Sequence, residues 1–432
     1  MSFDWAQIRN PTPKEFATLY GLPFNVRAWG AKGDGVTDDT AAIQACIDDA
    51  SQSNSDLLIA AGFPDTGGTV YFPPGIYRCS GLTMTVNKVT LKGEQWVSVL
   101  KGLDTASSPI LTTSNTRQRL EKLVFDGNRN GNNCVTTDGS GDTAWDLIID
   151  NCFFYGSNAR CYENINASNE FTTLRIYNCT FQGGDNGMVR ISKPWSGCIR
   201  DSMFQAGGGD NGVTDAIEYG LGIFHDEAGS GSAGYQFLVD NNYFEWNAQE
   251  VGVTGGFAPE FGPQGGVHKC KRAIRTDTRN IRITGNRFTF NSSDDQQLEA
   301  ILLEADSRAC LVENNIFGDR RASAVDIRLE SGSAKNLVRN NDGLTENVVI
   351  EDNATFQSNQ VWESQQIVTR GFKVYDRTTT QIGDAANPVN TNLKFRGSIV
   401  YGIDTDLLYV ANGSNATDTW SPSDGGTDIT PS

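Results

Sequence analysis

Histidine and long hydrophobic runs are scarce in this 432-residue chain. The two histidines, His225 and His268, cannot form a histidine-rich metal site, and none of the nine cysteines forms a CxxC pair of the zinc-binding kind. We therefore expect no metal and no other cofactor. No apolar run is long enough for a membrane span and no signal segment is visible. We expect no membrane insertion, and synthesis in a cytoplasm without a signal peptide.

Positive charge is also in deficit. Lys and Arg number 35 against 52 Asp and Glu, which gives a formal net charge of −17. This balance argues against a nucleic acid partner, because binding to nucleic acid depends on neutralising phosphate charge. The same charge disfavours an anionic membrane surface. Acidity also keeps a protein soluble, so the charge alone identifies no partner.

What the chain has instead is an internal repeat. Its copies are Leu147–Phe154, Leu174–Phe181, Phe237–Phe244 and Leu311–Phe317, with looser copies ending at Phe204 and Phe288. Each copy is an alternating apolar strand, a small polar residue and then Phe three places on. Self-similarity at a fixed period predicts stacked structural repeats. Cys152 and Cys179 occupy the same place in successive copies, so we expect reduced core thiols rather than a disulfide framework.

The intervals between equivalent small polar residues give the repeat length. From 151 to 178 is 27 residues, from 178 to 201 is 23, from 285 to 314 is 29 and from 314 to 340 is 26. These values suit one rung of a parallel β-helix. Two intervals are longer, 40 residues from 201 to 241 and 44 from 241 to 285. Long loops on a rigid scaffold are where function usually lies, which directs attention to 201–285.

The chain divides into three expected parts. Residues 1–22 are expected to form an arm, 23–362 the β-helix with its long loops within 201–285, and 363–432 a C-terminal β module and tail. In the β-helix, Phe24–Arg27 is predicted as a strand, and Thr37 or Asp38 is predicted to cap a helix over 39–50. Its apolar face of Ile43, Cys46, Ile47 and Ala50 is suited to cover the open end of the β-helix.

The C-terminal part breaks the repeat. Residues 397–413 read as two strands joined by a turn near Asp404–Asp406. The final stretch, Ser421–Ser432, is rich in Gly, Ser, Thr and Asp, and is expected to be loosely ordered. A terminal β module fits a trimerising cap, or a simple end-cap in a monomer.

The stretch FNVRAWGAKGDGVTDDTAAIQA at 24–45, followed by GGTVYFPPGIY at 67–77, resembles the opening of pectate-lyase-superfamily β-helices. That group includes phage tailspike depolymerases and, more distantly, polygalacturonases and mannuronan epimerases. The resemblance implies an all-β fold: a single-stranded right-handed parallel β-helix with an N-terminal capping helix and a small C-terminal β module. It does not fix the chemistry. The catalytic blocks of polygalacturonases and epimerases are absent here, and 201–268 lacks the arginine base of pectate lyases.

Between Arg200 and Lys269 the chain has no Lys or Arg but ten carboxylates. Glycoside hydrolysis needs two carboxyl groups in different protonation states, and crowded like charges raise one pKa. The predicted catalytic residues are Glu218, Asp226, Glu227 and Glu250, with acid and base unassigned. Gly220 and Gly222 beside them predict a shallow groove.

Trp246, Tyr219, His225, Glu245 and Arg190 are the predicted substrate-binding residues. His225 is also compatible with a structural histidine, and Arg190 with either an acidic sugar or solvent. Phe204, Phe237 and Phe244 are expected in the core.

Three functions remain open. The leading one is a phage tailspike-type depolymerase that hydrolyses a bacterial capsular polysaccharide or O-antigen as a homotrimer in the virion. The second is a polysaccharide lyase of the same fold acting on a uronate polymer, with His225 or a Tyr as base and with or without calcium on the carboxylates. The third is a glycan-binding tail fibre or adhesin without catalysis.

Overall fold

The computed structural model describes residues 12–20, 22–51, 67–105, 107–114, 117–128, 132–138, 146–157, 159–165, 171–182, 187–205, 219–224, 236–246, 271–290, 298–318, 324–344, 348–353, 359–362, 375–391, 394 and 398–432. The chain forms two compact units, 1–360 and 361–432. Among the described residues, no helix is long and apolar enough to cross a membrane.

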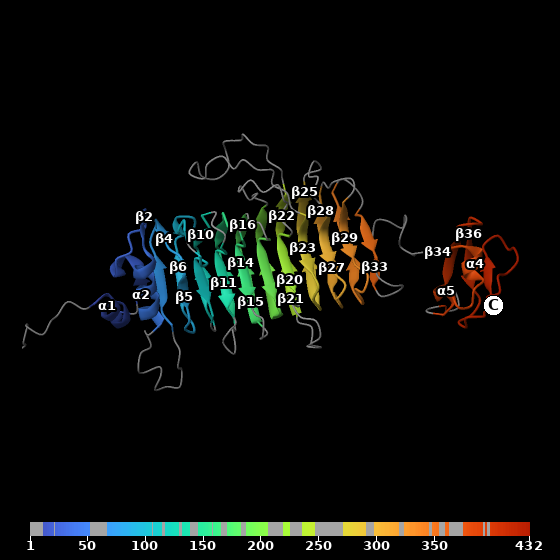
Figure 1. Ribbon diagram of the computed structural model, residues 1–432, viewed down its shortest axis with the longest axis horizontal. Helices are drawn as coiled ribbons and strands as arrows, with labels where there is room; N and C mark the ends of the chain where they lie inside the picture. Colours follow the sequence, from blue (N-terminus) through green and yellow to red (C-terminus); the bar gives the residue numbers. More distant parts are fainter. Residues whose placement is uncertain are drawn as a thin grey trace, which may run out of the picture. The chain divides into compact units, whose positions relative to one another are not determined.

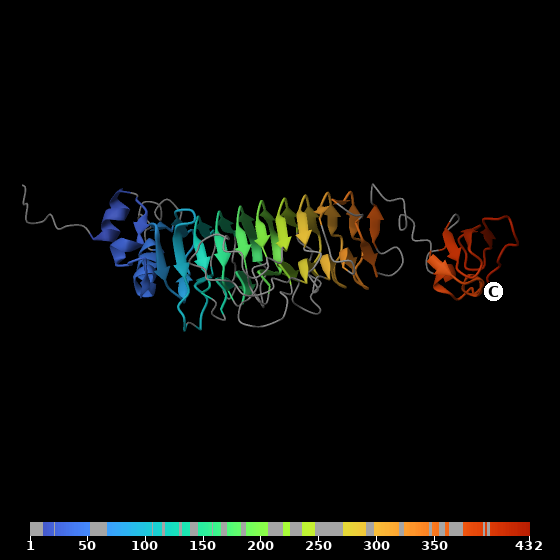
Figure 2. The same ribbon diagram turned by 90° about the horizontal axis from the view of Figure 1, so that it is seen from above.

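Unit 1 is a right-handed parallel β-helix, as predicted. Each rung contributes one strand to each of three long parallel sheets, and successive rungs lie side by side along the axis (Figures 1 and 2). We name the sheets A, B and C in the order in which a rung visits them.

Sheet A contains β1 (Phe24–Asn25), β3 (Thr69–Phe72), β6 (Thr90–Gly93), β9 (Arg119–Glu121), β12 (Leu147–Asp150), β15 (Phe171–Tyr177), β18 (Pro194–Arg200), β21 (Gln236–Asp240), β24 (Ile281–Thr284), β27 (Leu311–Glu313), β30 (Leu337–Arg339) and β33 (Gln360–Trp362). Sheet B contains β2 (Asp34–Asp38), β4 (Gly75–Arg78), β7 (Ser98–Lys101), β10 (Val124–Asp126), β13 (Phe153–Tyr155), β16 (Thr180–Gln182), β19 (Met203–Gln205), β22 (Tyr243–Trp246), β25 (Arg287–Phe290), β28 (Ile316–Phe317) and β31 (Asp342–Gly343). Sheet C contains β5 (Leu82–Met84), β8 (Leu111–Thr113), β11 (Val135–Asp138), β14 (Tyr162–Ile165), β17 (Val189–Ser192), β20 (Leu221–Phe224), β23 (Arg272–Thr276), β26 (Glu299–Leu303), β29 (Val325–Leu329) and β32 (Ile350–Asp352).

The small polar residue of the repeat makes the turn from sheet A to sheet B. It has a left-handed backbone, with φ between 51° and 66°, at Asn151, Asn178, Asp201, Asn241, Gly285, Asn314 and Asn340. Gly, Asn and Asp enter this region at the lowest cost, which explains the residue types of the repeat.

The repeated Phe forms one continuous column inside the helix. Its rings are Phe125, Phe154, Phe181, Phe204, Phe244, Phe288 and Phe317, all at most 1% exposed. Neighbouring centroids lie 4.6–5.0 Å apart. The core prediction for Phe204, Phe237 and Phe244 is confirmed. The repeat is therefore scaffold.

The cysteines are core thiols, as predicted. Eight are described and free, and seven of these are buried. Burial raises the pKa of Cys161 to about 12 and that of Cys310 to about 11. Such thiols stay protonated at neutral pH and pack as small apolar side chains.

The N-terminal end of the β-helix is covered by α2 (Thr40–Ser51). Its predicted apolar face of Ile43, Cys46, Ile47 and Ala50 is at most 1% exposed. Asp38 Oδ1 accepts a hydrogen bond from Thr40 N at 3.0 Å, but the N-cap position is Asp39, whose carbonyl accepts from Ile43 N at 2.9 Å, so neither Thr37 nor Asp38 occupies the predicted cap position. The predicted strand at 24–27 is partly wrong, because η2 (Val26–Trp29) follows β1 directly.

Part of the expected arm is a helix, α1 (Pro13–Tyr20). Thr12 and Glu15 form a reciprocal pair, with Glu15 N donating to Thr12 Oγ1 at 3.2 Å and Thr12 N to Glu15 Oε2 at 2.8 Å. Pro13 stands at the first helical position, where its missing N–H costs nothing. The expectation of an arm over 1–22 did not include this helix.

Unit 2 is a small β module with one four-stranded sheet. β34 (Tyr375–Arg377) pairs in parallel with β35 (Ile399–Gly402), while β36 (Leu407–Ala411) and β37 (Trp420–Pro422) continue antiparallel. The predicted hairpin is thus present. The helices α4 (Thr379–Ile382) and α5 (Pro388–Thr391) belong to the same unit.

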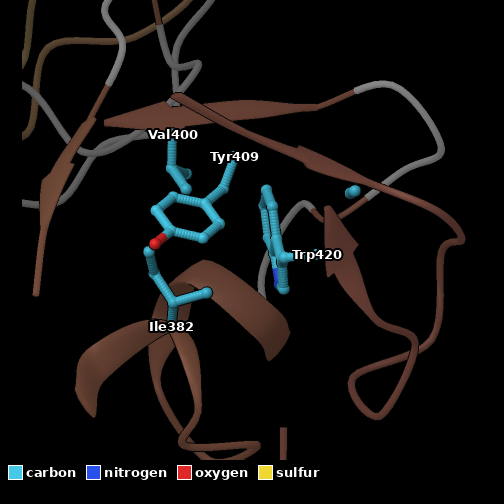
Figure 3. Packing of buried hydrophobic residues seen from close by; sticks show 5 residues of the cluster. Ile382, Val400, Tyr409 and Trp420 are labelled. Carbon is cyan, nitrogen blue, oxygen red and sulfur yellow. The ribbon is translucent and has the colours of Figure 1, made fainter. Parts of the chain in front are cut away.

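The core of unit 2 packs around a fully buried Trp420, with Ile382, Val400 and Tyr409 (Figure 3). Trp420 Nε1 donates to Asn390 Oδ1 at 2.8 Å. The prediction of a loosely ordered tail is wrong. Trp420 and Ile429 exchange backbone hydrogen bonds of 2.9 and 2.8 Å, and Ser432 N donates to Gly383 O at 2.9 Å.

Candidate active site

The two overlong intervals leave the strands themselves undisturbed. Arg200 of β18 pairs with Asp240 of β21, and Asp240 pairs with Thr284 of β24, as in regular rungs. The extra residues therefore fall between strands, in 206–218, 225–235 and 247–270, which lie outside the described residues. In the sequence, 206–218 precedes β20 of sheet C, 225–235 follows it, and 247–270 precedes β23 of the same sheet.

Charged side chains stand in register on the outer face of sheet C next to β20. Glu163 of β14 pairs with Arg190 of β17, Arg190 with Gly222 of β20, and Gly222 with Arg275 of β23. Side chains of a strand alternate between faces, and the neighbours Leu221 and Ile223 are fully buried in the core. This row therefore faces outward.

A phenylalanine lies between the two arginines of the row. The guanidinium carbon of Arg190 is 5.1 Å from the centroid of the Phe224 ring, and that of Arg275 is 5.5 Å from it. Cation–π contacts of this kind contribute about 0.5–2 kcal/mol each. They fix two guanidinium groups on either side of one aromatic ring.

Glycine makes room for this cluster. A Cβ at Gly222 would lie 2.4 Å from Cε2 of Phe224 and 2.6 Å from Cε2 of Tyr219. Gly187, with φ +108°, is as close to the same tyrosine ring. The expected shallow groove at Gly222 is therefore wrong, because two aromatic rings fill the space above it.

Carboxylates hold the arginines in place. Arg190 Nε lies 3.8 Å from Glu163 Oε1, which Arg160 also approaches at 3.0 Å. On the other side, Arg275 Nη2 lies 2.8 Å from Glu304 Oε1. Side chains of both arginines keep about a third of their surface exposed, at 30% and 32%. Guanidinium N–H groups in such positions can bind sugar carboxylates or hydroxyls.

One further carboxylate, Glu299, forms buried ion pairs with neighbouring strands of sheet C. Glu299 of β26 is fully buried between Arg272 at 2.8 Å and Arg328 at 2.6 Å. Burial raises its pKa, and the two guanidinium groups oppose that shift. Because Glu299 has no exposed surface, it holds Arg272 and Arg328 in position and does not touch a substrate.

The structure brings together only part of the predicted site. Glu218, His225, Asp226, Glu227 and Glu250 lie outside the described residues. The predicted catalytic set therefore stays a prediction.

Of the other predicted residues, Arg190 and Tyr219 meet around Phe224. The Tyr219 ring is 4% exposed and contacts Phe224 edge-on at 5.4 Å between centroids. Glu245 belongs to β22 of sheet B, a different face of the rung, where it accepts a hydrogen bond from Gln205 at 3.2 Å. Trp246 ends the same strand, and its side chain is not described.

Sequence reasoning missed Glu163, which pairs with Arg190, and Arg275, which shares the Phe224 ring with Arg190, as well as Glu304, which pairs with Arg275. The spacing from Glu163 to Arg190 is 27 residues, a regular rung, and this signal was available. Among the residues that the structure describes, no group of three or more His, Cys, Asp or Glu is arranged to hold a metal ion.

Comparison with known proteins places this geometry in a family. Two curated Azotobacter vinelandii proteins are similar over 123 residues, or 25% of the chain: mannuronan C5-epimerase AlgE5 at 37% identity and alginate lyase 7 at 34%. The matched stretches span only 11% and 13% of those two proteins. Among solved structures, tailspike protein 2 of an Escherichia coli O157:H7 bacteriophage superposes with a TM-score of 0.54 at 12% identity, covering 94% of this chain and 62% of the tailspike. The profile of the rhamnogalacturonase A/epimerase, pectate-lyase-like family matches residues 23–253, more than half of the sequence, and the chain belongs to that family.

Proposed function

We propose that this protein is a phage tailspike-type depolymerase that hydrolyses glycosidic bonds of a bacterial surface polysaccharide, a capsule or an O-antigen. Paired carboxylates among Glu218, Asp226, Glu227 and Glu250 act as acid and as base or nucleophile. The observation that carries the proposal is the position of the acidic insertions. In the sequence, they flank β20, whose Phe224 lies between Arg190 and Arg275 on the outer face of sheet C.

We assign catalysis to the carboxylates of the insertions and sugar binding to the cluster of Arg190, Phe224 and Arg275. The insertions supply carboxylates without any Lys or Arg between 201 and 268, a composition that raises the pKa of one carboxyl group above its neighbours. The arginine–phenylalanine cluster supplies a rigid floor that binds and orients a sugar next to them. The family and the tailspike fold agree with an enzyme that acts on polysaccharide.

The test is cleavage of a panel of purified capsular polysaccharides and O-antigens, followed by new reducing ends and by mass spectrometry of the products. Glu218→Gln, Asp226→Asn, Glu227→Gln and Glu250→Gln are assayed separately. Loss of a catalytic acid or base lowers turnover roughly a hundredfold or more. The matched control is Asp240→Asn, a carboxylate of the same cation-free stretch that is paired with Arg200 at 2.9 Å in sheet A. If all four variants cleave like the control, the carboxylate assignment is wrong.

A lyase acting on a uronate polymer is the second candidate. It is favoured by the 34% identity to alginate lyase 7 and by Arg190 and Arg275, whose side chains are about one third exposed and suit sugar carboxylates. Product chemistry separates the two enzymes. A lyase leaves an unsaturated uronate that absorbs in the ultraviolet, whereas a hydrolase leaves only a new reducing end. Glycan binding without any cleavage across the panel would instead support a tail fibre or adhesin.

We also propose that the protein works as a homotrimer in the virion, with the β module of 363–432 at the subunit contact. The tailspike fold and the separate C-terminal unit support this assembly. Sedimentation equilibrium of the full chain tests it. A monomer at micromolar concentration contradicts the trimer and leaves the proposed chemistry standing.

A further inference from the structure

The outer face of sheet B has a composition that neither the scaffold nor the sheet C site explains. The Phe column of sheet B points inward, so the residues on either side of each Phe point outward. One outward row runs, in register, through Lys101, Asp126, Tyr155, Gln182, Gln205, Glu245 and Thr289. Neighbouring members are about 4.8 Å apart, the spacing of paired strands.

Aromatic rings gather at one end of this row. The Trp96 and Phe153 centroids are 5.2 Å apart, and so are those of Phe153 and Tyr155. Trp96 is 51% exposed, and Val97 beside it is 50% exposed. Trp96 and Tyr155 each contact Phe153, and with half of the indole in solvent the three rings form an apolar surface of the kind that marks binding sites.

The backbone of Trp96 is left-handed, as it is at sixteen other non-glycine residues among those that the structure describes. Its φ is +69°, a left-handed conformation that costs a bulky residue about 1–2 kcal/mol. Glycine or asparagine would occupy that turn at lower cost.

The row continues from Tyr155 with side chains that match sugar hydroxyls. Gln182 and Gln205 each offer both donors and acceptors. Glu245, the next member, accepts a hydrogen bond from Gln205 at 3.2 Å. From Tyr155 to Glu245 the row holds no Lys or Arg, and in a chain of net charge −17 it repels an anionic polymer.

We infer that the outer face of sheet B, from Trp96 to Glu245, is a second glycan-binding surface that takes a neutral stretch of polysaccharide. The aromatic rings stack on sugar C–H faces, and the amides of Gln182 and Gln205 hydrogen-bond to hydroxyls. This surface belongs to a different sheet from the arginine cluster and performs no chemistry. It rests on the proposed function only in that the protein acts on a glycan.

The experiment is native gel electrophoresis of the full chain in gels containing dextran, galactomannan, xyloglucan or polygalacturonate. We expect retardation by at least one of the three neutral polymers. Trp96→Ala weakens it about tenfold, as the loss of one stacking contact implies. Gln182→Ala weakens it less. The matched control is Trp195→Ala, which removes another half-exposed tryptophan, 46% exposed, from sheet A and leaves retardation unchanged.

The results separate this inference from the proposed function. Arg190→Ala alters turnover or binding of acidic polymer but not retardation by the neutral one. The inference is overturned if none of the three neutral polymers retards the wild type, or if Trp96→Ala is retarded like the wild type. It is equally overturned if Trp96→Ala changes the sedimentation coefficient, because the face is then a contact between copies of the chain. None of these outcomes depends on whether the carboxylates cleave a polymer.

Discussion

The two halves of the β-helix differ in the residue that follows the left-handed turn between sheets A and B. The residue after the left-handed turn position is Cys152, Cys179 and Ser202 in the first half, and Asn242, Asn286, Asn315 and Asn341 in the second. All seven are nearly or fully buried. From 152 to 202 this column therefore holds two thiols and one hydroxyl, and from 242 to 341 it holds four amides.

The amides are joined to one another and to the backbone. Asn286 Oδ1 accepts from Nδ2 and from the backbone N of Asn242, both at 3.0 Å. Asn286 Nδ2 in turn donates to Asn315 Oδ1 at 3.0 Å and to Val239 O at 2.9 Å. Each amide thus ties neighbouring rungs together, whereas a thiol is a weak donor.

The change of chemistry coincides with the insertions. The first amide, Asn242, stands in the rung between the two overlong intervals, and Ser202 N donates to its Oδ1 at 3.0 Å. We infer that the amide column stabilises the rungs that carry the long loops. Mutations in the Phe column, the amide column and the thiols test whether the two halves differ in stability only through the amide column.

The largest expected effect is the same in both halves. Phe154→Ala and Phe244→Ala each remove a fully buried ring from the continuous column, and each should destabilise unit 1 by about 4 kcal/mol. If urea unfolding shows that both variants lose the same free energy of unfolding, the Phe column contributes equally to the two halves, and the halves differ elsewhere. A loss at Phe244 that exceeds the other by far means that the rings themselves pack differently around the insertions.

The next effect should separate the halves. Asn286→Ala strands the buried amide groups of Asn242 and Asn315, and should cost about 3 kcal/mol. Cys179→Ala removes one buried sulfur and should cost about 1 kcal/mol. Urea unfolding by circular dichroism measures both. Similar losses would mean that the amides stabilise no more than thiols do.

A smaller effect of opposite sign is expected from extending the amide column. Ser202→Asn places an amide next to Asn242, with Cys179 N, now donating to Ser202 Oγ at 3.1 Å, as a further donor. Each new buried hydrogen bond contributes about 1 kcal/mol. The midpoint of urea unfolding should therefore rise. The control Ser202→Ala should lower it, and a fall in both would show that the first half lacks room for an amide.

The sequence predicts the scaffold far better than the site, for a physical reason. Phe154, Phe181 and Phe244 repeat at positions fixed by strand periodicity, so their stacking can be read directly. The contact of Arg190 and Arg275 with Phe224 joins rungs separated by 206–218 and 247–270, and loop lengths do not reveal which residues face each other across them. The Asn column was visible in the sequence, but its hydrogen bonds need the register between rungs.

The smallest effect at neutral pH concerns the thiols of the first half. Burial raises the pKa of Cys161 to about 12, from an ordinary value of 9.0. A folded pKa above the unfolded one means that the protonated thiol stabilises the fold fully below pH 9, and that this contribution is lost as the pH rises toward 12. Cys161→Ala should therefore flatten the decline of the free energy of unfolding between pH 9 and pH 12.

Thiol labelling at pH 8 compares the same cysteines in the folded protein. Cys270→Ser first removes the cysteine that lies outside the described residues. In this background a thiol reagent should label the partly exposed Cys198 first and leave Cys161 unlabelled until the protein unfolds. Fast labelling of Cys161 in the folded protein would mean that the first half opens locally at β14, which Cys161 directly precedes.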